Sequence, residues 1–388
     1  MSVANLITQN FRNLDSATLT FHPGLNFFVG DNGSGKSSLL EAIFFLGHGK
    51  SFRTSKLDSL ARYNEQTFVV SVKDNNNCRL GLSRDVTLGT NSIKIDGERH
   101  TRLSVLAQNI AIQIVTPESF KLFFGGPKER RKFIDLGMFH VKQTFSKQWK
   151  DFNRVLKQRN ASIRLAQHES NSMLSYWNEQ FCCLSLKVSS MRAEYVSAII
   201  KELDVWIAIL LPDLKARVTV QYLQGWPQKK ELLDVLSSNY ERELNYGYSL
   251  YGAHKFDVKF LLDKQPLETQ LSRGQQKLFL LALTFAQAKS IAKVNRVKPI
   301  LLIDDVGAEL DINSRQCLAS ALKLLNCQTI ITAIETNVLQ PFLGRDLSDE
   351  TGLIKIDNLD NPDMVEENFK MFHVKHGKIT EKYPDDSE

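Results

Sequence analysis

The feature that most constrains this 388-residue chain is the octapeptide GDNGSGKS at residues 30–37. It matches the pattern G-x-x-x-x-G-K-S, in which glycines let successive backbone N–H groups converge on phosphate oxygens. The apolar run 25–29 predicts a strand before the octapeptide, and the run 37–43 predicts a helix after it. Strand, glycine-rich loop and helix together predict a phosphate-binding loop.

The side chains of this loop have separate expected tasks. Lys36 is expected to reach the β- and γ-phosphates and to act in catalysis, while the Ser37 hydroxyl is expected to ligate Mg²⁺. The loop alone would also suit a GTPase, a kinase or a helicase. The expected nucleotide-binding residues are Gly30, Asp31, Asn32, Gly33, Ser34, Gly35, Lys36 and Ser37.

Two further motifs follow more than two hundred residues downstream. The first is LSRGQQK at residues 271–277, where Ser272 is placed to cap a helix over 278–289 and Gly274 leaves its first turn open to an anion. The second is the run 299–303, which predicts a buried parallel strand ending in Asp304 and Asp305. Asp304 is expected to bind the metal, and Asp305 to orient or deprotonate the attacking water.

In this order, the three motifs resemble the ABC-type ATPases, in which the phosphate loop and the signature helix of two subunits close on one ATP. Within that superfamily the chain is most similar to the RecF family of the SMC-like, DNA-repair branch. The local strings that carry this resemblance are residues 10–13, 49–54, 116–119, 126–135, 271–277, 304–305, 309–311 and 371–379.

The resemblance implies ATP and Mg²⁺ as cofactors and an ATP-dependent homodimer. It also implies Arg12 and Asn13 as nucleotide contacts, DNA at a duplex, gap or junction as the target, and RecR and RecO as protein partners. The signature residues expected to act in trans are Ser272, Arg273, Gly274 and Gln275.

Several positions depart from related patterns. Residues 252–255 read Gly-Ala-His-Lys where the family has Gly-Pro-His-Arg, and Lys does not replace Arg at a bidentate site. Thr332 stands where transporter ATPases carry a histidine, so a hydroxyl is the most it could offer a γ-phosphate. Asp305 replaces a longer Glu, and both changes indicate slow hydrolysis. Gln113 is expected to be a solvated loop residue rather than a metal-coupling glutamine.

The periodicity changes along the chain. Residues 1–125 alternate strand-like runs with turns, whereas apolar spacings of three, four and seven over 141–159 and 177–206 predict two long helices. We expect an α/β fold, an ABC-ATPase head with a mixed sheet and an inserted helical arm subdomain. The expected parts are the head's N-terminal half at 1–125, the arm at 126–212 and the C-terminal half at 213–388. An arm of about 30 residues extends roughly 45 Å, too short for an SMC coiled coil.

Charge is unevenly placed although the net charge is only +6. Residues 128–167 contain eleven Lys and Arg against three Asp and Glu, a local net charge of +8, while residues 346–388 have a net charge of −7. A basic helix suits phosphate contacts that do not read base sequence. The expected DNA contacts are Lys142, Lys147, Lys150, Arg154, Lys157, Arg159 and Arg164.

Together these features predict a weak, cytoplasmic ATPase that acts as an ATP-dependent DNA-binding clamp, and the resemblance implies a role in recombinational repair and replication restart. The resemblance adds promotion of recombinase loading at gaps. No apolar run approaches the length of a membrane span. Two alternatives remain open: a non-hydrolysing ATP-dependent scaffold, and an ATPase subunit of another DNA-processing complex.

Overall fold

The computed structural model describes residues 2–166, 173–294, 298–343 and 369–382. The chain forms two compact units, one of residues 1–119 with 292–388 and one of residues 120–291. The second unit therefore contains the expected arm and also residues 213–291, which the sequence analysis assigned to the head. Most of the acidic segment 346–388 lies outside the described residues.

The first unit contains a six-stranded mixed sheet in the order β15-β14-β3-β13-β12-β8. All neighbours run parallel except the β14–β15 hairpin. The carboxyl ends of β3, β12 and β13 therefore meet at one edge, where open α/β sheets bind ligands. The strands are β3 (Leu25–Val29), β8 (Ala111–Val115), β12 (Pro299–Ile303), β13 (Gln328–Ala333), β14 (Phe369–Lys375) and β15 (Lys378–Lys382).

A second, antiparallel sheet of the same unit has the order β2-β1-β4-β5-β6-β7. Buried and more exposed side chains alternate along β4 and the start of β5, as expected for a sheet with one face on the core. The strands are β1 (Val3–Gln9), β2 (Ala17–Thr20), β4 (Thr67–Asp74), β5 (Arg79–Asp85), β6 (Thr90–Ile95) and β7 (Glu98–His100).

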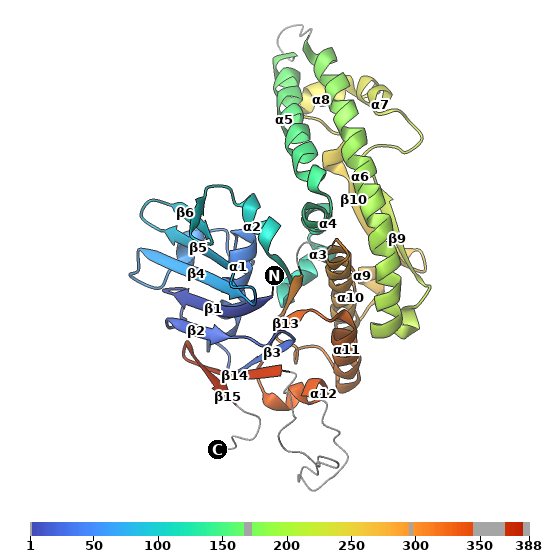
Figure 1. The fold of residues 1–388 in the computed structure, drawn as a ribbon. Helices are drawn as coiled ribbons and strands as arrows, with labels where there is room; N and C mark the ends of the chain where they lie inside the picture. Colours follow the sequence, from blue (N-terminus) through green and yellow to red (C-terminus); the bar gives the residue numbers. More distant parts are fainter. Residues whose placement is uncertain (1, 167–172, 295–297, 344–368, 383–388) are drawn as a thin grey trace. The chain divides into compact units, whose positions relative to one another are not determined.

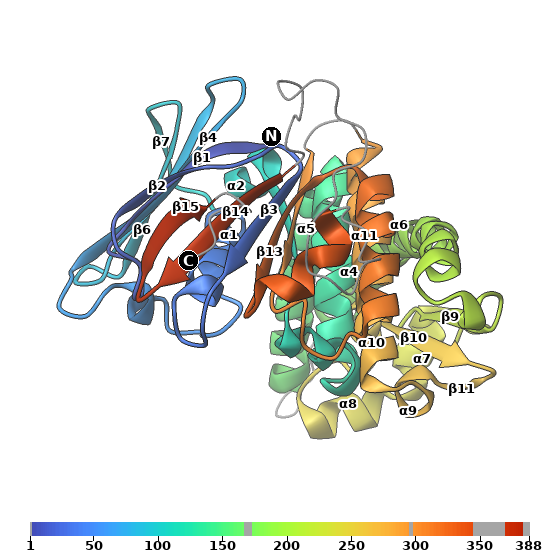
Figure 2. The same ribbon diagram turned by 90° about the horizontal axis from the view of Figure 1, so that it is seen from below.

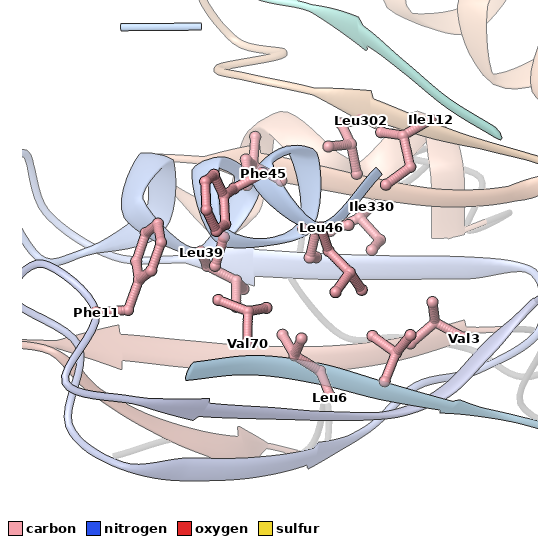
Figure 3. Close-up of a cluster of buried hydrophobic side chains, with 14 of the residues drawn as sticks. Val3, Leu6, Phe11, Leu39, Phe45, Leu46, Val70, Ile112, Leu302 and Ile330 are labelled. Carbon is pink, nitrogen blue, oxygen red and sulfur yellow. The ribbon is translucent and has the colours of Figure 1, made fainter. Parts of the chain in front are cut away.

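Helix α1 (Lys36–His48) lies between these two sheets (Figures 2 and 3), and ten of its 13 residues are buried. Such a helix is apolar nearly all round because both sides need a partner. It ends at Gly49, whose left-handed backbone directs its N–H to the Phe45 carbonyl. The buried side chains around α1 include Leu6 and Val70 from the antiparallel sheet and Ile112, Leu302 and Ile330 from the mixed sheet.

Shorter elements complete the first unit. Helix α11 (Ile312–Leu325) is capped by the Asp311 side chain, which accepts the Ser314 N–H. The others are α2 (Ser104–Asn109), α12 (Gln340–Leu343) and the 3₁₀ turns η1 (Leu57–Leu60), η2 (Pro117–Phe120, which reaches into the second unit) and η5 (Thr336–Leu339).

In the second unit, α5 (Gln143–Ala166) and α6 (Met173–Leu210) lie side by side as the two predicted long helices (Figure 1). Helix α6 packs against β9 of a three-stranded antiparallel sheet, which is formed by β9 (Val218–Leu223), β10 (Asp257–Leu262) and β11 (Gln265–Pro266). The remaining elements are α3 (Lys121–Phe124), α4 (Pro127–Val141), η3 (Pro212–Leu214), α7 (Leu232–Ser238), α8 (Tyr240–Tyr246), η4 (Ala253–Lys255), α9 (Leu267–Gln270) and α10 (Arg273–Ala292). None of the helices in the described ranges is long and apolar enough to cross a bilayer.

The stretch 252–255 packs on the arm. The His254 ring lies within 6.3 Å of the Phe152 ring and 6.0 Å of the Phe181 ring, between centroids, and its Nε2 is 3.0 Å from the Ser249 carbonyl. Burial lowers the pKa of His254 to about 4, so the ring is neutral at pH 7. His254 is a structural residue of the second unit.

The buried amide of Gln328 joins the two sheets of the first unit. Its Oε1 accepts the Val3 N–H at 2.7 Å, and its Nε2 donates to the carbonyls of Val3 at 2.7 Å and His22 at 3.0 Å.

We predict that Gln328→Met lowers the free energy of unfolding by about 2–4 kcal/mol, because these buried backbone groups lose partners. Urea unfolding measures this, with exposed Gln9→Met as the control. Equal stability of the two variants would contradict the prediction.

Candidate nucleotide-binding site

The loop that joins β3 to α1 holds its lysine on its own carbonyls. Lys36 Nζ donates to the oxygens of Gly30 at 2.5 Å and Asp31 at 2.8 Å. Burial lowers the pKa of Lys36, while the nearby carboxylates of Asp305 and Asp304 oppose that shift. The ammonium group therefore lies at the loop, where phosphate oxygens can replace the carbonyls as acceptors of its three N–H groups.

Ser37 and Asp304 lie together although 267 positions separate them in sequence. Ser37 Oγ is 3.2 Å from Asp304 Oδ1 and 3.1 Å from Asp304 Oδ2. The strands β3 and β12 bring them to one edge, as the sequence predicted. A hydroxyl beside a carboxylate suits Mg²⁺, which prefers oxygen ligands and keeps several waters. The two residues therefore fit the metal implied by the loop.

Thr332, at the end of β13, holds the acidic pair in place. Its Oγ1 donates to Asp304 Oδ1 at 2.8 Å and accepts the Asp305 N–H at 2.9 Å, and the residue is fully buried. In this structure the Thr332 hydroxyl is therefore engaged with the acidic pair. Asp305 has a left-handed backbone, with φ of 52°, which Asp tolerates better than most residues.

Arg12 and Asn13 reach the nucleotide loop by different routes. Asn13 Oδ1 accepts from Ser38 Oγ at 2.8 Å, and Asn13 Nδ2 donates to the Gly33 carbonyl at 3.2 Å. Arg12 instead donates two bonds of 2.9 Å to the fully buried carboxylate of Glu41 on α1. Asn13 therefore contacts the loop directly, whereas Arg12 contacts the helix α1 that follows it. That either residue contacts the nucleotide remains a prediction.

The β14–β15 hairpin also braces the loop, a role that sequence reasoning missed. Gly377 donates its N–H to the Ser34 carbonyl at 2.7 Å and accepts the Asp15 N–H at 3.0 Å. A Cβ added at Gly30 would lie 2.2 Å from the Val374 carbonyl oxygen, so only glycine fits there. The His376–Gly377 turn was a detectable signal, but its contact with residue 34 is not readable from sequence.

The expectation for Gln113 is wrong, because it lies within β8 rather than in a loop. It pairs with Leu301 of β12 and is only 3% exposed. Its Nε2 has no hydrogen-bond partner among the described residues.

The signature segment begins helix α10 in the second unit, which starts earlier than the predicted residue 278 and has the predicted Ser272 at its cap. The Gln275 N–H donates to Ser272 Oγ at 3.3 Å, and the Ser272 N–H donates to Gln275 Oε1 at 3.0 Å, a reciprocal capping box. The Arg273 guanidinium lies over the rings of Phe120 and Phe124, at 5.5 and 5.7 Å from their centroids. Gly274 sits in the first turn, so the start of the helix has no bulky side chain at that position.

Five of the seven expected DNA contacts are exposed on α5, at spacings that place them on one helical face. Arg154 pairs with Asp151 at 3.1 Å. Lys142, half-buried at the end of α4, pairs with Glu194 of α6. The exposed members, called the α5 stripe below, are Lys147, Lys150, Arg154, Lys157 and Arg164.

The expectation that Arg159 contacts DNA is wrong. Arg159 is 1% exposed and binds Glu243 at 2.5 Å, Ser249 at 2.6 Å and Asn178 at 2.8 Å. Its guanidinium also lies 5.1 Å from the Phe181 ring centroid. The side chain faces the interior of the arm and joins α5 to α6 and α8.

Known proteins are similar to this chain in sequence and in fold. The sequence profile of the family described as RecF/RecN/SMC N terminal domain matches residues 2–344. The DNA replication and repair protein RecF of Colwellia psychrerythraea is 64% identical over 379 residues, covering 98% of this chain and 97% of that protein. The RecF protein of Proteus mirabilis is 36% identical over 388 residues, covering 98% and 100%.

Solved structures agree with the fold. The recombination mediator protein RecF with ATPrS, in the RecFOR pathway, has a TM-score of 0.78 at 23% identity and covers 98% of both chains. The Smc head bound to the C-winged helix domain of ScpA has a TM-score of 0.56 at 16% identity, covering 99% of this chain and 98% of that one.

The fold and the loop define an ATP-binding protein of the ABC-type ATPase class that includes RecF and the SMC heads. Within that class, the chain belongs to the RecF family of DNA replication and repair proteins.

We predict that Thr332→Val lowers the ATPase rate about ten- to a hundredfold, as expected when the partner of a metal-site carboxylate is lost. Thr332→Ser, which keeps the hydroxyl, should restore most of the rate at a similar urea midpoint. Steady-state ATPase assays at varied Mg²⁺ measure the effect. If Val and Ser variants hydrolyse ATP equally well, Thr332 does not position the acidic pair.

We predict that Arg159→Met lowers the free energy of unfolding by about 3–5 kcal/mol, because Glu243 is left as a buried, unpaired charge. The matched control is exposed Lys157→Met, two positions away, which should change stability by less than about 0.5 kcal/mol. Urea unfolding followed by circular dichroism compares them. Near-equal stability would mean that Arg159 is not the interior anchor described above.

Proposed function

We propose that the protein is an ATP-dependent DNA-binding clamp with weak ATPase activity. The observation that carries the proposal is the meeting of Lys36, Ser37 and Asp304 at one edge of the mixed sheet. This supports binding of a nucleoside triphosphate with its γ-phosphate near the acidic pair. Membership of an ABC-type ATPase family supports ATP as that nucleotide.

The chain's own residues then divide the work of hydrolysis. Lys36 exchanges its hydrogen bonds with the loop carbonyls for hydrogen bonds with the phosphates, and its positive charge stabilises the negative charge of the transferred group. Ser37 and Asp304 hold Mg²⁺, which stabilises the developing phosphate charge when bound. Asp305 orients or deprotonates the attacking water. Its short side chain and the absence of a histidine at residue 332 support a slow rate.

The signature segment acts in trans in this proposal. Ser272, Gly274 and Gln275 of a second subunit complete the cage around the γ-phosphate, so that binding energy for ATP becomes dimerisation energy. The capping box supports this role, because it fixes Ser272 and Gln275 at the start of α10. Hydrolysis removes the shared ligand and releases the second subunit.

The DNA contact of the clamp is duplex or junction DNA held without sequence specificity on the α5 stripe. Exposure of five basic side chains on one face supports this, since such a face tracks phosphates. By family membership, we propose RecR and RecO as protein partners in the cytoplasm and recombinase loading at gaps as the outcome. A solved structural relative acts in the RecFOR pathway, which supports those partners.

We predict that ATP with Mg²⁺ doubles the mass of the purified protein in light scattering. Lys36→Met should abolish this by removing the phosphate contact, and Ser272→Arg by blocking the trans contact. Lys259→Met is the matched control, an exposed lysine on β10, and should dimerise like the wild type. A wild-type monomer at saturating ATP would refute the clamp and leave a partner-dependent head or a monomeric ATPase.

The role of hydrolysis is tested in the same preparation. Asp305→Asn should keep the ATP-dependent mass and slow DNA release. If release is unchanged while hydrolysis is lost, the protein is a non-hydrolysing scaffold in function, and ATP serves only its assembly.

A further inference from the structure

The antiparallel sheet of the first unit has two faces of different character. On β4, the side chains of Phe68, Val70 and Val72 are buried toward the core that contains α1, while those of Ser71 and Lys73 are only half-buried on the other face. That outer face forms an open groove of about 560 Å³ over β1, β4, β5 and β6. The nucleotide site does not use it.

Like charges stand opposite each other on this outer face. Lys73 of β4 is the cross-strand partner of Arg79 on β5, and Lys94 of β6 is the partner of Arg99 on β7. Among the described residues, none of the four side chains makes an ion pair; Asp96 accepts the backbone N–H of Arg79 instead. Directly opposed like charges destabilise a sheet, so this arrangement costs stability unless an anion is bound.

Gly81 forms the floor between these cations. It lies in the middle of β5, opposite Ser71 on one side and Lys94 on the other, in a continuous register without a bulge. A Cβ at Gly81 would meet its nearest atoms at 3.5 and 4.0 Å, which is ordinary contact. The fold therefore does not require glycine here. A glycine inside a strand often marks the close approach of a ligand or another backbone.

Between the cations the lining of the groove is mainly apolar, with three serines among it. Ser71, Ser83 and Ser92 share this face and can donate hydroxyl hydrogen bonds. The described lining residues include no aromatic side chain, which argues against stacked bases of a single strand and against the aromatic anchors of a protein partner. Asp85 shares the face, and its Oδ1 accepts the Leu88 N–H.

We propose that this groove binds the sugar-phosphate backbone of duplex DNA, with Lys73, Arg79 and Lys94 on the phosphates and Gly81 allowing close approach. The first unit then makes its own DNA contact, separate from the α5 stripe. The inference rests on the proposed DNA-binding function and extends it to a second surface.

The test uses the full chain with ATP and Mg²⁺ and a fluorescent duplex titrated at several salt concentrations. For Lys73→Gln with Lys94→Gln, the slope of log affinity against log salt should become shallower by about 2, since each lost phosphate contact removes about 0.9. Affinity at 0.1 M salt should fall at least tenfold. The matched control is Lys259→Gln with Lys323→Gln, two exposed lysines outside the groove, which should keep the wild-type slope.

Gly81→Glu separates a ligand role from a structural one. The added carboxylate should raise the urea midpoint by relieving repulsion between the cations, yet weaken duplex binding at least tenfold. Gly81→Gln, with the same size and no charge, should weaken it less. If Gly81 has only a structural role, Gly81→Glu should lower the urea midpoint instead of raising it. That result would overturn the proposal.

The remaining outcomes are distinct. An unchanged salt slope in the double-lysine variant, with ATP-dependent mass intact, refutes the groove and leaves the proposed function standing. A wild type that dimerises but binds no duplex refutes both DNA proposals. A poly-glutamate peptide is titrated in the same way as the duplex. If the double-lysine variant loses binding of this peptide but keeps the wild-type salt dependence of duplex binding, the groove recognises an acidic protein and the DNA assignment is wrong.

Discussion

Burial of α1 between two sheets is the constraint on which the rest of the first unit depends. The helix is apolar on nearly every side because Leu6 and Val70 press on it from one sheet and Ile112 and Leu302 from the other. The phosphate loop leads directly into this buried helix, so the core fixes the end of the loop, while Asn13 and the β14–β15 hairpin brace the loop itself.

The parts that sequence predicted well are those set by local chemistry. The strand at 25–29, the strand at 299–303 and the cap at Ser272 were all recoverable, because glycine spacing, apolar runs and a capping box act within a few residues. The proximity of Ser37 and Asp304 followed from one further rule, that parallel strands end at the same edge. Little of the site beyond these residues could be deduced, since it depends on contacts between distant segments.

The failures share a physical cause, which is tertiary contact overriding residue type. Arg159 was assigned to DNA for its charge, although it lies four residues after Val155 and seven after Phe152, the spacing of the buried face. A buried Glu243 on α8, 84 positions away, decides its role. Gln113 was likewise misjudged, because pairing of β8 with β12 in the mixed sheet buries it.

The two faces of the antiparallel sheet show how one set of strands can serve stability and recognition together. Alternation lets β4 give Val70 to the core and Lys73 to the outer face without conflict between them. On the core side the apolar side chains of β4 pack in the core with α1, whereas on the outer side Gly81 and the opposed cations each oppose the fold. Local choices that oppose the fold are expected at functional sites, where a ligand offsets their cost. Gly81 and the opposed cations all lie on one face of the sheet, around one groove. This arrangement argues for a single ligand that offsets the cost of all of them.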